Sequence, residues 1–570
     1  MERTFNTGGL YFVNVTANQQ FMYAVIISIL TFLLTWATVA LDSTTLANAQ
    51  TNSKSYITTT IGGDSSNFSN IAITHGIAGG DVTNHSAIIW SKSNKNSVMN
   101  VWYDTNPNMT NPKISQQHPI VNQSTDFTGH IKLESLKPDS VYYYQVQFSD
   151  PKNTSLVSQR SAIGLFHTAP NSDSSTTNKS AISFVVGGDL GGQNYCRRTE
   201  LSGGYPIFAV IKALSPDFFV FNGDQIYSDY TCTSNGPTNV TGWHNIPGNY
   251  SSVTDNSVNW NDPKQIQRSF DAHWEYNRAD PFLKSLLQNT SMYSQADDHE
   301  VLNNYGGLWK HYNEAYKNRT GYSNVVNEGI KAFFNFSPID ITDSNNSTHT
   351  KPTIYRSFHW GKDLDLFILD AHSYRSRNDL PDSSVNKTLF GKEQLKWLEQ
   401  GLLNSKATWK VISDDDPISI PSCDEKESLH TPRGCDNWAT DGKSRLSFTR
   451  ERADFMKFLD DHNISNVIFV TTDVHFPANI VINEDPNHDG KRLVLYELVS
   501  GPLAAGPADK PDKLDPTINA TYLYSEGKIF TFGHYTLKKS SSDGSVHFVA
   551  EVRGIDDLVR PGSHLDLRPK

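Results

Sequence analysis

The chain has 570 residues, enough for one to three domains, and 11% of them are aromatic while only 19% are charged, which excludes an intrinsically disordered protein. Its formal net charge of −11 argues against a general nucleic-acid-binding surface, because phosphate backbones are held by basic patches. We therefore expect a folded protein that acts on a small molecule, and we expect it to be a monomer.

The N-terminal part contains one long apolar segment. Residues Met22–Leu41 carry no charge and are numerous enough to span a bilayer as a helix. Ala47-Asn-Ala49 follows, a sequence typical of signal-peptide cleavage sites. We favour cleavage after Ala49, with residues 1–49 as an uncleaved membrane anchor as the alternative, and expect residues 50–70 to be a disordered leader. Either alternative predicts an extracytoplasmic protein, secreted or at the cell surface, that touches a membrane only through an uncleaved segment.

Two further features agree with export. Sequons for N-glycosylation are frequent, for example at Asn84, Asn249 and Asn463, although a chain rich in Asn, Ser and Thr also produces them by chance. The number of cysteines is even, which favours two disulfides in an oxidising compartment. The four are Cys196, Cys232, Cys423 and Cys435, and we expect the last two to close a local loop.

Residues 71–168 have the pattern of a small β-sandwich, because short strand-like runs alternate with turn-rich stretches. The runs are Ser86–Trp90, Val98–Tyr103, His130–Leu133 and Val141–Phe148. The stretch Leu136–Tyr142 (LKPDSVY) resembles a turn of fibronectin type III domains. We expect this domain to have a packing role, and we expect residues 169–180 to be a polar linker.

Residues 181–570 alternate strands and helices, which predicts an α/β domain whose central sheets are flanked by helices. The predicted strands are Ile182–Val186, Phe218–Phe221, Leu364–Leu369, Trp409–Ile412, Val467–Val470 and Leu493–Leu498. The predicted helices are Ile207–Leu214, Ile266–Leu287, Lys392–Leu403 and Arg450–Asp461. Long insertions at residues 228–265 and 305–355 are expected to surround the site.

Several predicted strands end in an aspartate, namely Asp189, Asp224, Asp370 and Asp473. Because the ligand sites of open α/β sheets lie beyond the carboxyl ends of the strands, these carboxylates should converge at one edge. Carboxylates so close together repel one another unless a cation lies among them, so a metal site is predicted. A single strand-end aspartate is commonly just a turn residue, but several together with Asp297-Asp-His-Glu300 and His475 are far more specific.

Six motifs follow one another along the chain. They are Gly188–Gly192 (GDLGG), Asn222–Tyr227 (NGDQIY), Asp297–Asn304 (DDHEVLNN), Leu369–Arg375 (LDAHSYR), Thr472–His475 (TDVH) and Glu497–Pro502 (ELVSGP). Together they resemble the PhoD-type alkaline phosphatases of the calcineurin-like metallophosphoesterase superfamily. The resemblance covers about residues 71–555 and implies a small N-terminal β-sandwich before the metallophosphoesterase domain.

The resemblance also implies a set of metal ligands. Asp189 would ligate one ion, Asp224 would bridge two ions, and Tyr227 would bind one through its phenolate oxygen. The remaining ligands would be Asp298, Asp473 and His475. Two or more metal ions are implied, iron and calcium first, with zinc, manganese and magnesium as alternatives. A ligand set rich in oxygen suits hard cations.

Other residues receive roles at the reacting group. His299 would contact the phosphoryl oxygen or protonate the leaving group. Asn303 and Asn304 are further candidates for a metal or phosphate contact. At one position the chain departs from the family, because His372 stands where family members commonly carry arginine. Arg375 and Arg377 remain to hold phosphate.

A second departure concerns sulfur. Family members with an iron centre use a cysteine thiolate as a ligand, and Cys196 is the candidate for that contact here. The alternative, which we favour, is a disulfide between Cys196 and Cys232, since both loops leave the same edge of the predicted sheet in an oxidising compartment.

The resulting functional prediction is an exported, metal-dependent phosphomonoesterase or phosphodiesterase whose metal-activated hydroxide releases phosphate from a small-molecule phosphoester. Two alternatives remain: a catalytically silent surface glycoprotein with the same fold, and a phosphatase of the purple acid type. Asp473-Val-His475 in place of His-x-His argues against the purple acid type.

Overall fold

The computed structural model describes residues 70–173, 181–200, 203–238, 240–306, 319–341, 353–423, 434–444, 446–510 and 513–570. The predicted apolar segment and the cleavage site after Ala49 lie outside these ranges. The chain divides into two units, Met1–Asn67 and Phe68–Lys570, and the description below concerns the second. Within the described ranges, none of the helices has both the length and the apolar character needed to cross a bilayer.

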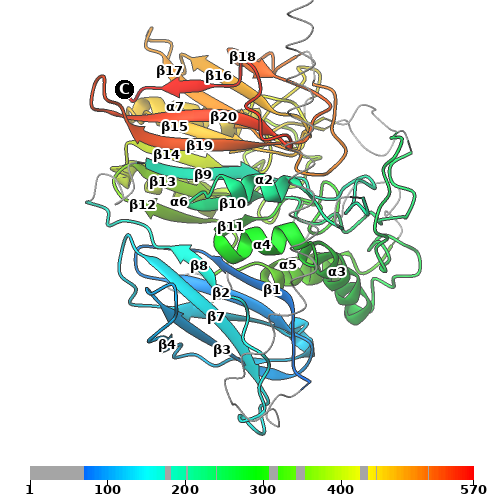
Figure 1. Ribbon diagram of the computed structural model, residues 1–570. Helices are drawn as coiled ribbons and strands as arrows, with labels where there is room; N and C mark the ends of the chain where they lie inside the picture. The colour runs from blue at the N-terminus through cyan, green and yellow to red at the C-terminus, as the bar shows by residue number, and fades with distance from the viewer. Residues whose placement is uncertain are drawn as a thin grey trace, which may run out of the picture. The chain divides into compact units, whose positions relative to one another are not determined.

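The N-terminal strands form two sheets around a common core (Figure 1). One sheet contains β1 (Ile73–Gly80), β2 (Ala87–Ser93) and β6 (Thr128–Leu133). The other contains β4 (Lys113–Ile114), β3 (Ser97–Asp104), β7 (Val141–Ser149) and β8 (Gly164–His167), with β5 (Ile120–Val121) paired to β3. The Tyr142 hydroxyl accepts a hydrogen bond from the Lys137 N–H at 2.9 Å, which fixes the turn before β7. The four predicted strand-like runs are confirmed.

The N-terminal strands continue the sheet of the α/β domain, which the strand pattern did not predict. Strand β1 pairs in parallel with β11 (Ser291–Gln295) at Gly80 and Met292. A Cβ atom at Gly80 would lie 2.6 Å from the Met292 carbonyl oxygen, so only glycine permits this approach. Nearby, Arg356 binds both carboxylate oxygens of Asp81. The two regions are therefore joined by one continuous sheet.

This first sheet has nine strands in the order β21-β20-β19-β9-β10-β11-β1-β2-β6. The strands not yet given are β9 (Ala181–Gly187), β10 (Phe218–Asn222), β19 (Thr531–Lys539), β20 (Val546–Gly554) and β21 (Leu565–Leu567). The second sheet has the order β12-β13-β14-β15-β17-β16-β18. Its strands are β12 (Arg356–Trp360), β13 (Leu364–Ile368), β14 (Trp409–Ser413), β15 (Val467–Thr471), β16 (Ala478–Glu484), β17 (Leu493–Val499) and β18 (Ala520–Ser525).

The two sheets pack face to face and helices cover their outer faces. Strand β10 illustrates this packing, because its side chains point alternately to the two faces. Phe218 and Val220 belong to the core between the sheets. Phe219 and Phe221 belong to the core between the first sheet and its helices. A strand buried on both faces reads as a continuous apolar run. The helices α2 (Ile207–Ala213), α3 (Pro263–Arg278), α4 (Pro281–Asn289) and α5 (Tyr322–Phe336) pack against the first sheet, and α6 (Gly391–Asn404) and α7 (Thr449–Asp461) against the second.

All six strands predicted in the α/β domain are confirmed, but one predicted helix is wrong. The segment Ile266–Leu287 is not one helix, because α3 ends at Arg278 and α4 begins at Pro281. The Asp280 side chain caps α4 by accepting the Leu283 N–H at 2.8 Å, and proline at the next position cannot continue a preceding helix. Helix α5 was not predicted and lies within the insertion at 305–355.

Candidate metal centre

The predicted strand-end aspartates lie at one edge of the packed sheets. Asp189, Asp224 and Asp473 follow β9, β10 and β15 and have φ angles of 60°, 48° and 64°. Residues other than glycine rarely adopt positive φ, and such strain is concentrated at functional sites. A Cβ atom at Gly188 would lie 2.2 Å from the Asn222 carbonyl oxygen, so the loops after β9 and β10 touch at this glycine. The backbone thus brings these carboxylates together.

Two overlapping groups of side chains have the spacing of metal ligands. Ligand atoms of Asp189, Asp224 and His475 lie within 4.8 Å of one another, and so do those of Asp224, Asp298 and His299. Asp224 belongs to both groups, which is the placement that a carboxylate bridging two ions needs.

His475 is oriented as a metal-binding imidazole. Its Nδ1 lies 2.8 Å from the carbonyl oxygen of Gly506, so Nε2 faces the cluster, 2.7 Å from the Tyr227 hydroxyl and 3.8 Å from Asp189 Oδ1. Burial lowers the pKa of His475 to about 4, so the imidazole is neutral near pH 7. A neutral imidazole whose second nitrogen donates to a backbone carbonyl is the usual form of a histidine ligand.

The electrostatics of the cluster fit a cation. Burial, and then the neighbouring carboxylates, raise the pKa of Asp189, Asp224 and Asp473 well above the ordinary value of aspartate. Both carboxylate oxygens of Asp189 are buried, and no side chain in the described ranges donates a hydrogen bond to them. Burying carboxylates in this way is costly unless a positive charge lies among them. This donor set therefore fits hard metal ions.

His299 is held by Asp229, a residue that the sequence analysis missed. His299 Nδ1 lies 2.6 Å from Asp229 Oδ1, while Nε2 lies 3.8 Å from Asp298 Oδ1. Burial alone would lower the pKa of His299, but Asp229 and Asp298 raise it to about 9. The Tyr227 ring packs against the imidazole with centroids 4.2 Å apart. His299 is therefore protonated near pH 7, and Asp229 holds its imidazole in place.

We expect Asp229→Asn to lower phosphoester hydrolysis about 10- to 100-fold, because the imidazole loses the carboxylate that orients it. Removal of that negative charge also lowers the pKa of His299, so the alkaline limb of the kcat/KM profile should move to lower pH. The measurement is the pH–rate profile of the variant beside Asp255→Asn, an exposed aspartate of the same insertion. An alkaline limb that stays in place in Asp229→Asn contradicts the assignment.

Backbone contacts brace the loops that carry the ligands. Glu300 accepts the N–H groups of Asp224, Gln225 and Asp297 at 3.2, 2.6 and 2.9 Å. The Asn304 N–H donates to Asp298 Oδ2, and the Asn303 N–H donates to Asp229 Oδ2 at 3.2 Å. The structure thus gives Asn303 and Asn304 bracing roles, and their contact with metal or phosphate stays a prediction.

A third acidic group lies around His372. Ligand atoms of Asp297, His372 and Asp415 are within 4.8 Å of one another, and His372 Nε2 is 3.1 Å from both Asp297 Oδ1 and Asp415 Oδ2. Burial would lower the pKa of His372, but these carboxylates raise it well above its ordinary value. The positive charge of His372 therefore neutralises the carboxylates of Asp297 and Asp415. In the sequence its members stand apart, in Asp297-Asp-His-Glu300, at His372 and in the run Asp414–Asp416 directly after β14.

The two arginines predicted to hold phosphate differ in surroundings. The buried guanidinium of Arg375 lies 3.0 Å from Asp436 Oδ1 and 3.2 Å from Asp416 Oδ2, so it neutralises these carboxylates, and its contact with phosphate stays a prediction. The side chain of Arg377 is 43% exposed and forms an ion pair with Asp379. Its phosphate contact stays a prediction. Asp370 caps its own loop by accepting the Ser373 N–H at 2.9 Å.

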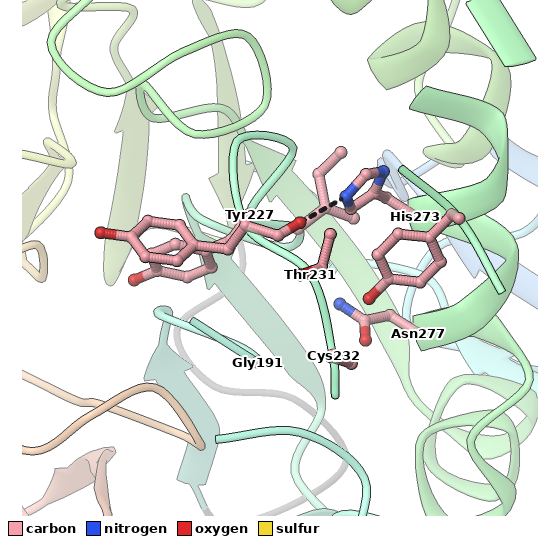
Figure 2. A pocket seen from close by; sticks show the side chains of 9 residues that line it. Gly191, Tyr227, Thr231, Cys232, His273 and Asn277 are labelled. Carbon is pink, nitrogen blue, oxygen red and sulfur yellow. Dashed lines mark hydrogen bonds between the residues drawn. The ribbon is translucent and has the colours of Figure 1, made fainter. Parts of the chain in front are cut away.

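The loop after β10 borders a small pocket next to α3 (Figure 2). From α3, His273 Nε2 lies 2.9 Å from the carbonyl oxygen of Tyr230, and Asn277 Nδ2 donates to the carbonyl oxygen of Gln225 at 2.7 Å. Figure 2 shows the Tyr227 ring pointing away from these two side chains. Helix α3 therefore fixes the backbone of the loop whose other side carries Tyr227.

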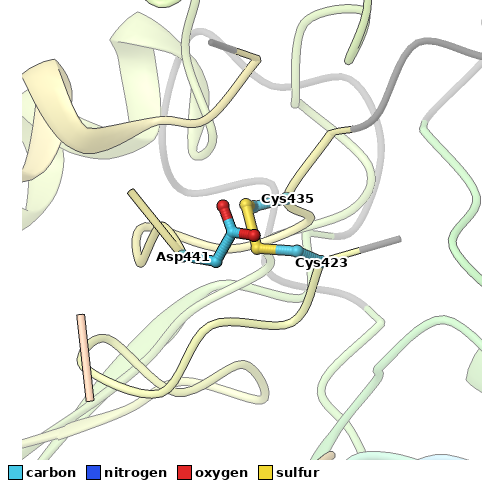
Figure 3. A group of neighbouring side chains, drawn as sticks. All are labelled: Cys423, Cys435 and Asp441. Atoms are coloured by element: carbon cyan, nitrogen blue, oxygen red, sulfur yellow. A yellow bond between two sulfur atoms is a disulfide. The ribbon is translucent and has the colours of Figure 1, made fainter. Parts of the chain in front are cut away.

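The four cysteines form two disulfides, Cys196–Cys232 and Cys423–Cys435. The first ties the loop after β9 to the loop after β10, so Cys196 is not a free thiolate and the predicted metal contact through its sulfur is wrong. The second lies beside Asp441 (Figure 3). Because both sulfurs of that group are in a disulfide, they carry no charge and the group is not a metal site.

Strand-end carboxylates, a phenol and imidazoles at the edge of sheets flanked by helices define an α/β protein with an acidic candidate metal site. Two family models match the chain: PhoD-like phosphatase over residues 184–542, and PhoD-like phosphatase, N-terminal domain, over residues 58–170. The chain therefore belongs to the PhoD-like phosphatase family, a family of phosphoester hydrolases, as its motifs predicted. Alkaline phosphatase D of Bacillus subtilis (strain 168) is 25% identical over 463 residues, which cover 77% of this chain and 70% of that protein.

Solved structures share the fold. A structure of PhoD superimposes with a TM-score of 0.63 at 18% identity, covering 88% of this chain and 94% of that one. The purple acid phosphatase PPD1 from yellow lupin (Lupinus luteus) seeds superimposes with a TM-score of 0.51 at 13% identity, covering 86% of this chain and 72% of that one. At these identities the likeness establishes the fold alone.

Proposed function

We propose that this chain is an extracytoplasmic, metal-dependent phosphoester hydrolase that acts on phosphomonoesters or phosphodiesters. The observation that carries the proposal is Asp224, a buried carboxylate whose oxygens belong to two groups of candidate ligand atoms and whose pKa is raised by burial and by the neighbouring carboxylates. A catalytically silent glycoprotein has no need to keep such an unfavourable cluster.

The ligands divide into two sets. Asp189, Asp224, Tyr227 and His475 would hold one cation, and Asp224, Asp298 and Asp473 a second. Because most of these donors are oxygens, ferric iron and calcium are the cations proposed. When bound, such cations neutralise phosphate oxygens and make water acidic enough to serve as a nucleophile.

The chain itself supplies the proton for the leaving group. Asp229 accepts a hydrogen bond from the Nδ1–H of the protonated imidazole, and the second proton, on Nε2, points toward the ligand cluster. His299 passes this proton to the ester oxygen as the bond to phosphorus breaks. The Tyr227 ring covers one face of the imidazole and keeps water from that face.

The location outside the cytoplasm rests on sequence and disulfides together. The apolar segment before Ala49, the frequent sequons and the two disulfides all agree with an oxidising compartment. The bond between Tyr142 and Lys137 supports a fibronectin type III-like N-terminal domain, since such a tyrosine corner recurs in β-sandwiches of this kind.

The direct test is phosphate release by the purified chain from a panel of phosphomonoesters and phosphodiesters, before and after chelation. We expect release from at least one ester, loss after chelation, and recovery when iron and calcium are returned. If the metal-loaded protein releases nothing from any ester, the proposed function is rejected.

A further inference from the structure

Tyr230 is an exposed aromatic residue beside the proposed proton donor. Tyr230 is 39% exposed, whereas Tyr227 is buried and only 7% of the Asp229 side chain is exposed. The Tyr230 ring stands edge-on to His299, with centroids 5.8 Å apart and planes inclined by 62°. It also stands edge-on to Tyr227, at 6.0 Å and 72°. Tyr230 is thus the outermost ring of a three-ring cluster that contains the proton donor.

The backbone of Tyr230 is held from three directions. Its N–H donates to the carbonyl oxygen of Tyr227 at 3.1 Å. Its own carbonyl oxygen lies 2.9 Å from Nε2 of His273 on α3, the contact drawn in Figure 2. Two residues later, Cys232 is joined to Cys196. An exposed ring on so constrained a backbone loses little conformational freedom when a ligand packs against it, which favours binding.

Proton transfer from His299 requires the leaving group of the substrate to lie near the ring of Tyr230. The ester oxygen must come within hydrogen-bond distance of His299 Nε2 to receive its proton. The group attached to that oxygen then extends from the proton donor toward solvent. Among the described residues, Tyr230 is an exposed aromatic side chain in contact with His299, and a flat leaving group can pack against its ring.

We propose that Tyr230 is a binding residue for the leaving group and makes the enzyme prefer phosphoesters of aromatic alcohols. This inference rests on the proposed function and adds a substrate class to it. The attraction is that of an offset or edge-to-face ring pair, which favours an aromatic leaving group over a saturated one about two- to tenfold.

The test compares benzyl phosphate with cyclohexylmethyl phosphate, whose alcohols have similar acidity and differ in ring planarity. For the metal-loaded full chain, kcat/KM for benzyl phosphate should be about two- to tenfold higher than kcat/KM for cyclohexylmethyl phosphate. In Tyr230→Ala the ratio should fall to about one, chiefly through a higher KM for the benzyl ester. In Tyr230→Phe the ratio should persist, because the ring remains.

A matched control is Tyr374→Ala, since Tyr374 is 38% exposed and its ring packs against Tyr355, 5.4 Å away. This control should keep the ratio of the wild type. Persistence of the benzyl preference in Tyr230→Ala, or its absence from the wild type, overturns the inference.

Binding of benzylphosphonate and cyclohexylmethylphosphonate to the same variants gives a second readout without turnover. The benzyl compound should bind more tightly to the wild type, and the difference should vanish in Tyr230→Ala. If no ester is hydrolysed, the proposed function fails, and the phosphonate comparison still decides whether Tyr230 binds aromatic groups.

Discussion

Replacing Asp224 with asparagine should reduce phosphoester hydrolysis by about three orders of magnitude, because metal charge contributes several kcal/mol to the transition state. The side chain keeps its size but loses the charge that both ligand groups share. The measurement is kcat/KM for a nitrophenyl phosphate with iron and calcium supplied. If Asp224 bridges the two ions, the loss of kcat/KM should persist at saturating metal concentrations. If Asp224 only increased metal affinity, excess metal would restore the activity.

Asp217→Asn provides the control for this result. Asp217 precedes β10 at the end opposite Asp224, is buried, and accepts the Ser183 N–H at 2.9 Å. Its replacement should affect stability and leave hydrolysis close to wild type in the folded fraction. A folded Asp224→Asn protein with wild-type activity would falsify the bridging role.

Removing the metal ions should destabilise the protein more strongly at alkaline than at acidic pH. The pKa values of Asp189, Asp224 and Asp473 in the folded, metal-free protein lie well above their unfolded values near 4, first because of burial. The folded state therefore binds more protons than the unfolded state between these values. Its stability must then fall as pH rises from about 4 toward the raised folded pKa values.

The measurement is the Tm of the protein with and without chelator, compared between about pH 5 and about pH 8. Chelation should lower Tm at both, and by more at about pH 8, where the carboxylates of the empty cluster are forced to ionise. The chelated Asp189→Asn variant should lose less Tm on going to alkaline pH, because one of these charges is gone. A chelated wild type whose Tm rises over this range contradicts the electrostatic account.

The strands and the core of the site were predictable because both depend on local sequence. The apolar run Phe218–Phe221 is buried on both faces, and Asn222 followed by a glycine and an aspartate marks the strand end. The same pattern, an apolar run followed by glycine and aspartate, predicted that Asp189 follows strand β9. Asp280 and Pro281 also indicate the boundary between α3 and α4. The boundary was not predicted because the apolar residues keep a helical period across it.

The rest of the site depends on contacts between distant parts of the chain. The pairing of β1 with β11 joins segments more than two hundred positions apart, and periodicity carries no information about such partners. The ion pairs of Arg375 are of the same kind, because Asp416 and Asp436 come from other loops. Asp229 was missed for a different reason, since an aspartate in a polar insertion is ordinarily a solvated turn residue.

The proposed hydrolysis depends on metal ions held by Asp224 and its neighbours. Elemental analysis of the purified full chain, beside its Asp224→Asn variant, measures this directly. We predict at least two metal ions per wild-type chain, with fewer in the variant. A wild-type protein that hydrolyses phosphoesters while containing no metal, or a variant that keeps the full metal content, would contradict it.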